Sequence, residues 1–261
     1  MKARPVQCAA TIANRVGPIL IFMGAWQAFT MLGLTDPAFL PGLGAIGDAL
    51  LNLLGSRELF INLGVSLLTG MSGLVLGILI GVPLGMLMAL SKLADGFFGP
   101  IVKATYSLPK SALIPLFVLW FGVGGMTNIL AVTLTAILPI VIYTYHGVHS
   151  VPHIFVWSAK SLGTPNWKML VRILLPASSH AILTGIRIAL GFSFIITIAA
   201  EMIVSNYGIG KLMFQYGDSG AYNYMFAAIV AVVIVAYLAD VSLMALTDYI
   251  LRWQDPVEKH G

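Results

Sequence analysis

The sequence predicts an all-α, polytopic membrane protein with about six transmembrane helices. Of its 261 residues, 59% are hydrophobic and only 9% are charged, whereas soluble domains are about one-quarter charged. The mean hydropathy is +0.94, and no soluble core of this length needs so many apolar residues. Long apolar runs recur along the chain, and a run of about 20 residues can cross a bilayer as a helix.

Five apolar regions carry the predicted spans, and the third is long enough for two helices. They lie at about 17–34, 64–90, 111–147, 180–204 and 225–250. The third region divides near Gly122–Thr127, where three glycines interrupt the apolar run. This division gives six spans, although hydropathy alone also permits five.

The distribution of Lys and Arg predicts the orientation of the spans. With the N-terminus in the cytoplasm, only Arg57 and Lys211 lie outside, and Arg187 lies within a span. The other basic residues then lie inside or at the inner boundary: Lys2, Arg4, Arg15, Lys92, Lys103, Lys110, Lys160, Lys168, Arg172, Arg252 and Lys259. Because cytoplasmic loops carry such an excess, we expect six spans with both termini in the cytoplasm. The net charge of +4 reflects this topology and does not indicate nucleic acid.

A short polar and basic segment separates two of the apolar regions. It reads Trp157-Ser158-Ala159-Lys160-Ser161-Leu162-Gly163, followed after nine residues by Ile173-Leu174-Leu175-Pro176. Thr164-Pro165 predicts the start of a helix, because Thr caps helices and Pro suits the first helical position. Gly163 permits a sharp bend before this helix, and Pro176 predicts its end.

Apolar side chains recur on one face of this second helix, at Trp167, Leu170, Val171 and Leu174. On that periodicity alone, the helix could equally lie on a lipid surface with its basic residues inside the cell. The spacing from Gly163 to Ile-x-Leu-Pro favours a docking element instead.

This pattern resembles the cytoplasmic loop signature of the membrane subunits of ABC importers, in which a short helix pair docks into the ATPase subunit and transmits its motion to the pore. The family loop usually opens with an acidic residue and two alanines, where this chain has Trp157-Ser158-Ala159. That departure implies a specialised ATPase partner. The resemblance implies a coupling role for these residues: Trp157, Ser158, Ala159, Lys160, Ser161, Leu162, Gly163, Ile173, Leu175 and Pro176.

The resemblance runs from about Phe39 to Trp253 and narrows the family to the nitrate, taurine and alkanesulfonate importer permeases. It is carried by residues 108–124, 183–191, 200–202 with 207–210, and 251–253. It implies a fold like that of type I ABC importer permeases. Residues 1–261 would form a single multi-pass permease domain in a bacterial inner membrane, with a coupling loop at about 148–178.

The resemblance also implies the partners and the solute. The partners are a second permease copy, two ATPase subunits that bind ATP and Mg, a periplasmic or lipid-anchored solute-binding protein, and membrane lipid. The implied solute is small, such as a sulfonate or nitrate anion, although related members also handle thiamine-precursor pyrimidines. We expect no cofactor or metal in this chain itself.

Motifs for chemistry within the chain are weak. The segment Gly42–Gly47 fits G-x-G-x-x-G, but it follows a membrane span and no strand precedes it. No phosphate-binding loop is visible, so we expect a conduit and not an enzyme. His146, His149 and His153 would share one helix face only if the helix continued through Pro152, so we expect no metal there.

Four glycines recur every fourth residue in the second span, at Gly73, Gly77, Gly81 and Gly85. They form a flat stripe that allows another backbone to approach closely. We interpret the stripe as a helix-packing surface, with a sliding or gating surface as the alternative.

Arg187 and Glu201 are charged residues within the predicted fifth span. They are 14 residues apart, or about 21 Å along a helix, which is too far for them to pair. We expect each to face the bundle interior, the dimer seam or the translocation pathway, with interfacial snorkelling or a structural ion pair as the alternative.

The carboxylates Glu201 and Asp240 keep a stand-alone, ion-coupled secondary transporter as the rival function. No inverted repeat or broken-helix pair is evident in the sequence to support that rival. A membrane-embedded enzyme ranks last, because no nucleophile or metal cluster can be argued from spacing.

Overall fold

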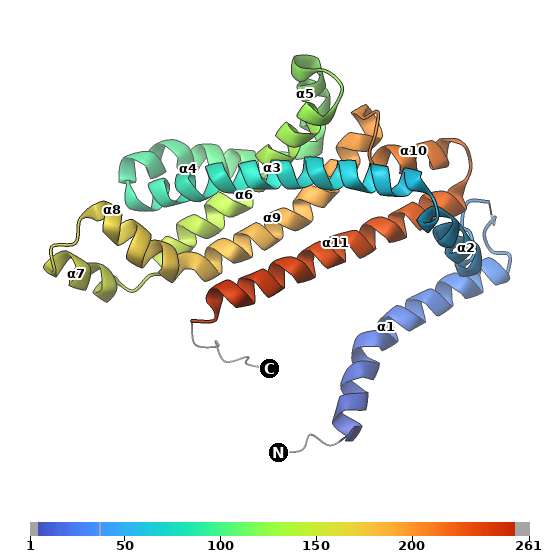
Figure 1. The fold of residues 1–261 in the computed structure, drawn as a ribbon, viewed down its shortest axis with the longest axis horizontal. Coiled ribbons are helices and arrows are strands. Elements are labelled where there is room, and N and C mark those ends of the chain that lie inside the picture. Colours follow the sequence, from blue (N-terminus) through green and yellow to red (C-terminus); the bar gives the residue numbers. More distant parts are fainter. Residues whose placement is uncertain (1–4, 37, 254–261) are drawn as a thin grey trace. The chain divides into compact units, whose positions relative to one another are not determined.

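The computed structural model describes residues 5–36 and 38–253, and all the regular elements assigned in that range are helical. Figure 1 shows their course. In chain order they are α1 (Pro5–Met31), α2 (Leu43–Leu54), α3 (Arg57–Leu90), α4 (Lys92–Tyr106), the 3-10 turn η1 (Lys110–Leu113), α5 (Ile114–Phe121), α6 (Gly125–His149), α7 (His153–Ser161), α8 (Asn166–Met169), the π-helical turn η2 (Leu170–Leu174), α9 (Leu175–Val204), α10 (Ile209–Asp218) and α11 (Tyr222–Leu251).

Four helical segments of the described chain are long and apolar enough to cross a membrane. They are Arg57–Leu90, Gly125–His149, Trp167–Val204 and Tyr222–Leu251. Residues Gly17–Met31 of α1 form a shorter apolar helix. The all-α membrane fold is thereby confirmed.

The chain divides into two compact units. One contains the residues up to Ile61 together with Leu212–Val232, and the other contains Asn62–Lys211 together with the residues from Val233 on. In the first unit, the indole of Trp26 donates to the carbonyl of Pro41 (3.1 Å), and the side chain of Gln27 accepts from the Leu43 amide (2.9 Å). These two bonds fix the connection between α1 and α2. A single permease domain over the whole chain stays a prediction.

The core of the second unit is built on close contact between α3 and α6 (Figure 1). Gly73, Gly77, Gly81 and Gly85 of α3 face, in that order, Val132, Ala136, Ile140 and Thr144 of α6. A methyl group at any of the four would lie 2.6–2.9 Å from its α6 neighbour. The predicted stripe therefore lies against α6, and its register shows that the two helices run in the same direction.

Helix α9 packs against the same core in the opposite direction. Gly147 near the end of α6 faces Ser178 and Ala181 near the start of α9, and Gly185 of α9 faces Tyr143 of α6. A core cluster joins the three helices: Leu74, Ala136, Ile140, Ile182, Ile186, Ala189 and Leu190.

Because α3 and α6 are parallel, the chain between them must return across the unit. This return is made by α4, η1 and α5, and not by a single helix. The apolar run predicted from about residue 111 corresponds to the short apolar helix Lys110–Phe121, and α4 precedes it with Ser91 as its cap. The predicted break before α6 is confirmed, since Gly122 and Gly124 adopt φ values of +78° and +143° there.

The packing of α3 on α6 leads to a stability prediction. We expect Gly77→Ala to lower the free energy of unfolding by about 1–3 kcal/mol, because the new methyl group would overpack against the Cβ of Ala136 at 2.7 Å. Gly64→Ala on the same helix is the matched control, since nothing lies within 4 Å of that position. Thermal unfolding of the detergent-solubilised variants would measure the difference, and equal midpoints would contradict this account.

Candidate functional site: the coupling loop and the charges within the spans

The segment between α6 and α9 contains the predicted helix pair, and its bend has a specific hydrogen-bond pattern. The Gly163 amide donates to Lys160 O, and the Thr164 amide donates to Ala159 O, both at 3.0 Å. Gly163 has a φ of +69°. This is the Schellman ending of α7, in which glycine takes the left-handed position at the lowest steric cost.

The second helix starts as predicted but does not stop where predicted. The Met169 amide donates to Pro165 O at 3.0 Å, so the helix begins directly after the proline. Pro176 was expected to end it, yet the chain stays helical from Trp167 to Val204. The π-helical turn η2 precedes Pro176, with the Leu175 amide bonded to Leu170 O five residues back. Inside a continuous helix Pro176 removes one backbone donor and its ring crowds the preceding turn, and the wider π-helical turn η2 directly before it accommodates this.

The loop is anchored by small and apolar residues and presents large side chains outward. Ala159 and Leu174 are buried, and Leu174 packs with Met86, Val148 and Val151 at the ends of α3 and α6. The remaining predicted coupling residues are exposed or half-buried: Trp157, Ser158, Lys160, Ser161, Leu162, Gly163, Ile173, Leu175 and Pro176.

Three large apolar side chains dominate this exposed surface. Trp157, Leu162 and Trp167 have exposed fractions of 64%, 84% and 64%. The ring of His153 stacks on Trp157, with centroids 6.1 Å apart. The stacked His153 and Trp157 side chains thus lie at the position where the loop signature that this segment resembles usually has an acidic residue. Large exposed apolar patches mark interaction surfaces.

Glu201 near the end of α9 is fully buried in a polar cluster of the second unit. Its Oε2 accepts from the Ser66 hydroxyl at 2.7 Å and from the Gly210 amide at 3.0 Å. The Ser66 hydroxyl also accepts from the Ile209 amide at 2.8 Å, and Asn62 accepts from the Gly208 amide at 2.7 Å.

These bonds fix the turn that follows α9 against α3. Gly208 has a φ of +119°, and any Cβ there would overlap the Glu201 carboxyl group. Glu201 is buried, in line with the expectation that it faces the bundle interior, and its Oε2 accepts from one backbone amide and one hydroxyl. Ser66 and Asn62 were not singled out from sequence. Their signal was two polar residues four apart in an otherwise apolar helix.

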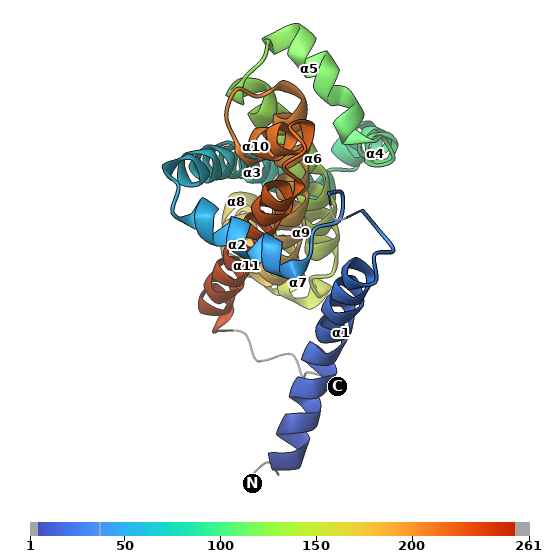
Figure 2. The ribbon, with the colours of Figure 1, turned by 90° about the vertical axis from the view of Figure 1, so that its right-hand side faces the viewer.

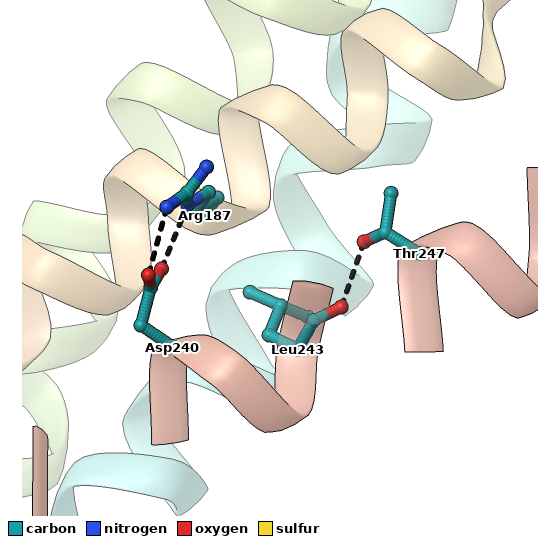
Figure 3. Close-up of polar contacts among 4 residues, drawn as sticks. All are labelled: Arg187, Asp240, Leu243 and Thr247. Atoms are coloured by element: carbon teal, nitrogen blue, oxygen red, sulfur yellow. Dashed lines mark hydrogen bonds and ion pairs between the residues drawn. The ribbon is translucent and has the colours of Figure 1, made fainter. Parts of the chain in front are cut away.

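Arg187 pairs with Asp240, as Figure 3 shows. Its Nε and terminal NH2 nitrogen donate to the two carboxylate oxygens at 2.7 and 2.8 Å. Farther along α11, the Thr247 hydroxyl donates to Leu243 O within its own helix. The Arg187 and Asp240 side chains are 49% and 33% exposed in the single chain. Their bidentate geometry neutralises both charges inside apolar helices.

The three histidines singled out from sequence lie at the end of α6 and the start of α7. His149 Nδ1 lies 3.0 Å from Tyr145 O, and His153 is engaged with Trp157. Pro152 separates the two helices. Within the described residues, no group of three or more His, Cys, Asp or Glu side chains is placed to hold a metal.

The chain matches known proteins over most of its length. Residues 81–256 match the family described as binding-protein-dependent transport system inner membrane component. The chain is 31% identical to the taurine transport system permease protein of Escherichia coli (strain K12), over 93% of this chain and 90% of that protein. It is 31% identical to a putative aliphatic sulfonates transport permease protein of the same strain, over 92% of each chain.

Solved structures support the fold. An inward-facing methionine ABC transporter matches with a TM-score of 0.59 at 22% identity, covering 76% of this chain and 96% of that chain. An amino acid ABC transporter matches with a TM-score of 0.60 at 16% identity, covering 77% of this chain and 97% of that chain. The chain therefore belongs to the family of inner membrane components of binding-protein-dependent transport systems.

Proposed function

We propose that this chain is the translocation subunit of an ABC importer for a small sulfonate or a related solute. The observation that carries the proposal is the exposed helix pair of α7 and α8, whose second helix continues without interruption into the span α9. Relatives named for taurine and aliphatic sulfonates support the solute class.

The working assembly in this proposal has two permease copies, two ATPase subunits and an external solute-binding protein, set in membrane lipid. ATP and Mg bind to the ATPase subunits, and this chain binds neither. Both termini and the coupling loop lie in the cytoplasm, as the excess of Lys and Arg favours.

The mechanism is alternating access driven through the coupling loop. Closure of the ATPase subunits moves the surface formed by Trp157, Leu162 and Trp167. Because the helix is continuous from Trp167 to Val204, this motion acts directly on α9 and its contacts with α6. The π-helical turn η2 is the natural place for adjustment, since such turns have poorer hydrogen bonding and recur at functional sites. Solute passes when the helices rock between two packings.

Arg187 and Glu201 take structural parts in this proposal. The two charges of the Arg187–Asp240 pair neutralise each other, and Glu201 is enclosed by Ser66 and Gly210. The pairing of Asp240 with Arg187 disfavours the ion-coupled rival, in which a free carboxylate at that position would carry a proton or cation.

A reconstitution experiment tests the function. The chain is purified with its ATPase and placed in liposomes with its binding protein, and uptake of taurine and ethanesulfonate is measured. We expect uptake that needs ATP and the binding protein, and no ATP hydrolysis by the permease without its partner. Uptake driven by an ion gradient in the absence of ATP would instead establish a secondary transporter.

Coupling should depend on the conformation of Gly163. We expect Gly163→Val to insert normally but to lose most transport, at least about tenfold, because a β-branched residue is a genuine outlier at a φ of +69°. Gly163→Asn is the matched control and should retain most transport, since Asn tolerates the left-handed region. The measurement is solute uptake at matched expression. Equal uptake by both variants would show that the bend at Gly163 plays no part in coupling.

The ion pair leads to a further prediction. Arg187→Leu leaves Asp240 without its partner in a span, so we expect a lower unfolding midpoint and less co-purified ATPase. The double variant Arg187→Leu/Asp240→Leu should recover assembly, because no charge remains to be buried. Thermal unfolding and the yield of complex measure both. If the Arg187→Leu variant assembles normally but has lost uptake, Arg187 acts in the translocation pathway and not only in structure.

A further inference from the structure

A cavity lies between α4 and α6 in the second unit. Its volume is about 480 Å³, which falls in the usual range for small-molecule sites. Helix α4 runs beside α6 (Figures 1 and 2), and Val102 of α4 packs in one cluster with Leu138 and Val141 of α6. The cavity is therefore held between two helices that pack on each other.

One face of α4 forms a wall of this cavity. Its lining residues recur at the steps of three and four residues that keep side chains on one side of a helix. They are Asp95, Gly99, Val102, Lys103 and Tyr106. The wall thus carries one acidic and one basic side chain, with apolar and aromatic groups beside them.

The two charged side chains lie on either side of Gly99. Asp95 is half-buried and Lys103 is exposed. They are eight residues apart, or about 12 Å along the helix axis. The Asp95 carboxylate lies against Gly99, since its Oδ1 would be 3.3 Å from a Cβ atom at that position. Side chains of a helix tilt toward its N-terminus, which brings the Lys103 side chain back toward Asp95.

Neither of these charges is neutralised within the chain. The Tyr145 hydroxyl of α6 donates to Asp95 Oδ2 at 3.2 Å. No residue whose side chain the structure describes forms an ion pair with Asp95 or Lys103. A carboxylate accepts at both of its oxygens, so Oδ1 can receive a further donor.

Asp95 also has a structural role, because an acidic residue in the first turn of a helix stabilises that end of the helix. This role requires neither a cavity nor a basic residue two turns farther on. The pairing of both charges with one cavity therefore points to a ligand.

We infer that this cavity binds a small zwitterion, in which a short apolar chain joins an ammonium group to a sulfonate or carboxylate group. Asp95 receives the ammonium group, and Lys103 receives the acidic group. Val102 and Ile142, which also line the cavity, contact the chain between them. This inference rests on the proposed function, and it narrows the solute to an acid that also carries an ammonium group.

The test measures ligand binding without transport. The complex of this chain with its ATPase, in lipid nanodiscs without ATP or binding protein, is heated in taurine, β-alanine, ethanesulfonate or ethylamine. Taurine and β-alanine carry both charges, whereas ethanesulfonate and ethylamine carry one each. We expect a zwitterion to raise the unfolding midpoint at a concentration about tenfold or more below that of either single-charge compound, because it makes one more charge-assisted hydrogen bond.

Two substitutions separate the two charges. Asp95→Asn keeps an acceptor for Tyr145 but removes the negative charge. The half-maximal concentration of the zwitterion should then rise about tenfold or more, while ethanesulfonate should bind no more weakly. Lys103→Gln should weaken both ligands. Lys92→Gln removes an exposed lysine of α4 that does not line the cavity, and it should behave as the unmodified chain.

Chemical protection replaces the first variant where Asp95→Asn fails to fold. The unmodified complex is acetylated and analysed by mass spectrometry, with and without each ligand. The zwitterion should slow modification of Lys103 but not of Lys92, at concentrations where ethanesulfonate has no effect.

The inference is overturned by any of three results: no zwitterion stabilises the unmodified complex, the preference for zwitterion over ethanesulfonate is unchanged in Asp95→Asn, or the zwitterion protects Lys92 and Lys103 equally. The proposed function is judged separately. ATP-driven uptake by a complex that binds no zwitterion in this cavity supports the importer and contradicts the site. Zwitterion binding that depends on both charges, without ATP-driven uptake, supports the site and contradicts the importer.

Discussion

Contact between the backbones of α3 and α6 determines the layout of the second unit. A glycine at every fourth residue of α3 leaves no side chain on one face, and Val132, Ala136, Ile140 and Thr144 of α6 fill that space. The match holds in only one direction, so the two helices are parallel. Parallel neighbours require a return crossing between them. That crossing is made by α4, η1 and α5, and it is not helical at residues 107–109.

The proposed transmission of force depends on a second feature, the helical continuity between the α7–α8 pair and α9. A proline that ended the helix at residue 176 would have separated the loop from the span by a flexible joint. The wider turn of η2 keeps the backbone helical instead, with a bond from the Leu175 amide to Leu170 O. Buried Ala159 and Leu174 fasten the loop to the ends of α3 and α6. In the proposed mechanism, a displacement of the exposed aromatic surface therefore reaches α9 through continuous helix, with η2 as the place where the packing adjusts.

The sequence predicted those features that depend only on the residue types within one short segment. Residues such as Gly163 and Gly122 predicted bends because positive φ favours glycine, and the four-residue repeat from Gly73 predicted a packing face. The sequence could not supply the partner of that face, because the match to α6 links residues 59 positions apart. The pairing of Arg187 with Asp240, 53 positions apart, was hidden for the same reason. Hydropathy also missed α4, since Lys92, Asp95 and Lys103 interrupt its apolar residues.

The charged residues within the spans differ in the partners that their neighbours provide. Glu201 receives an amide and a hydroxyl at one of its oxygens and closes a turn that only glycine at position 208 permits. Arg187 and Asp240 exchange two hydrogen bonds and leave no net charge. Charges paired in this way have already used most of their electrostatic attraction on each other, and they keep little of it for an ion that arrives from outside the chain.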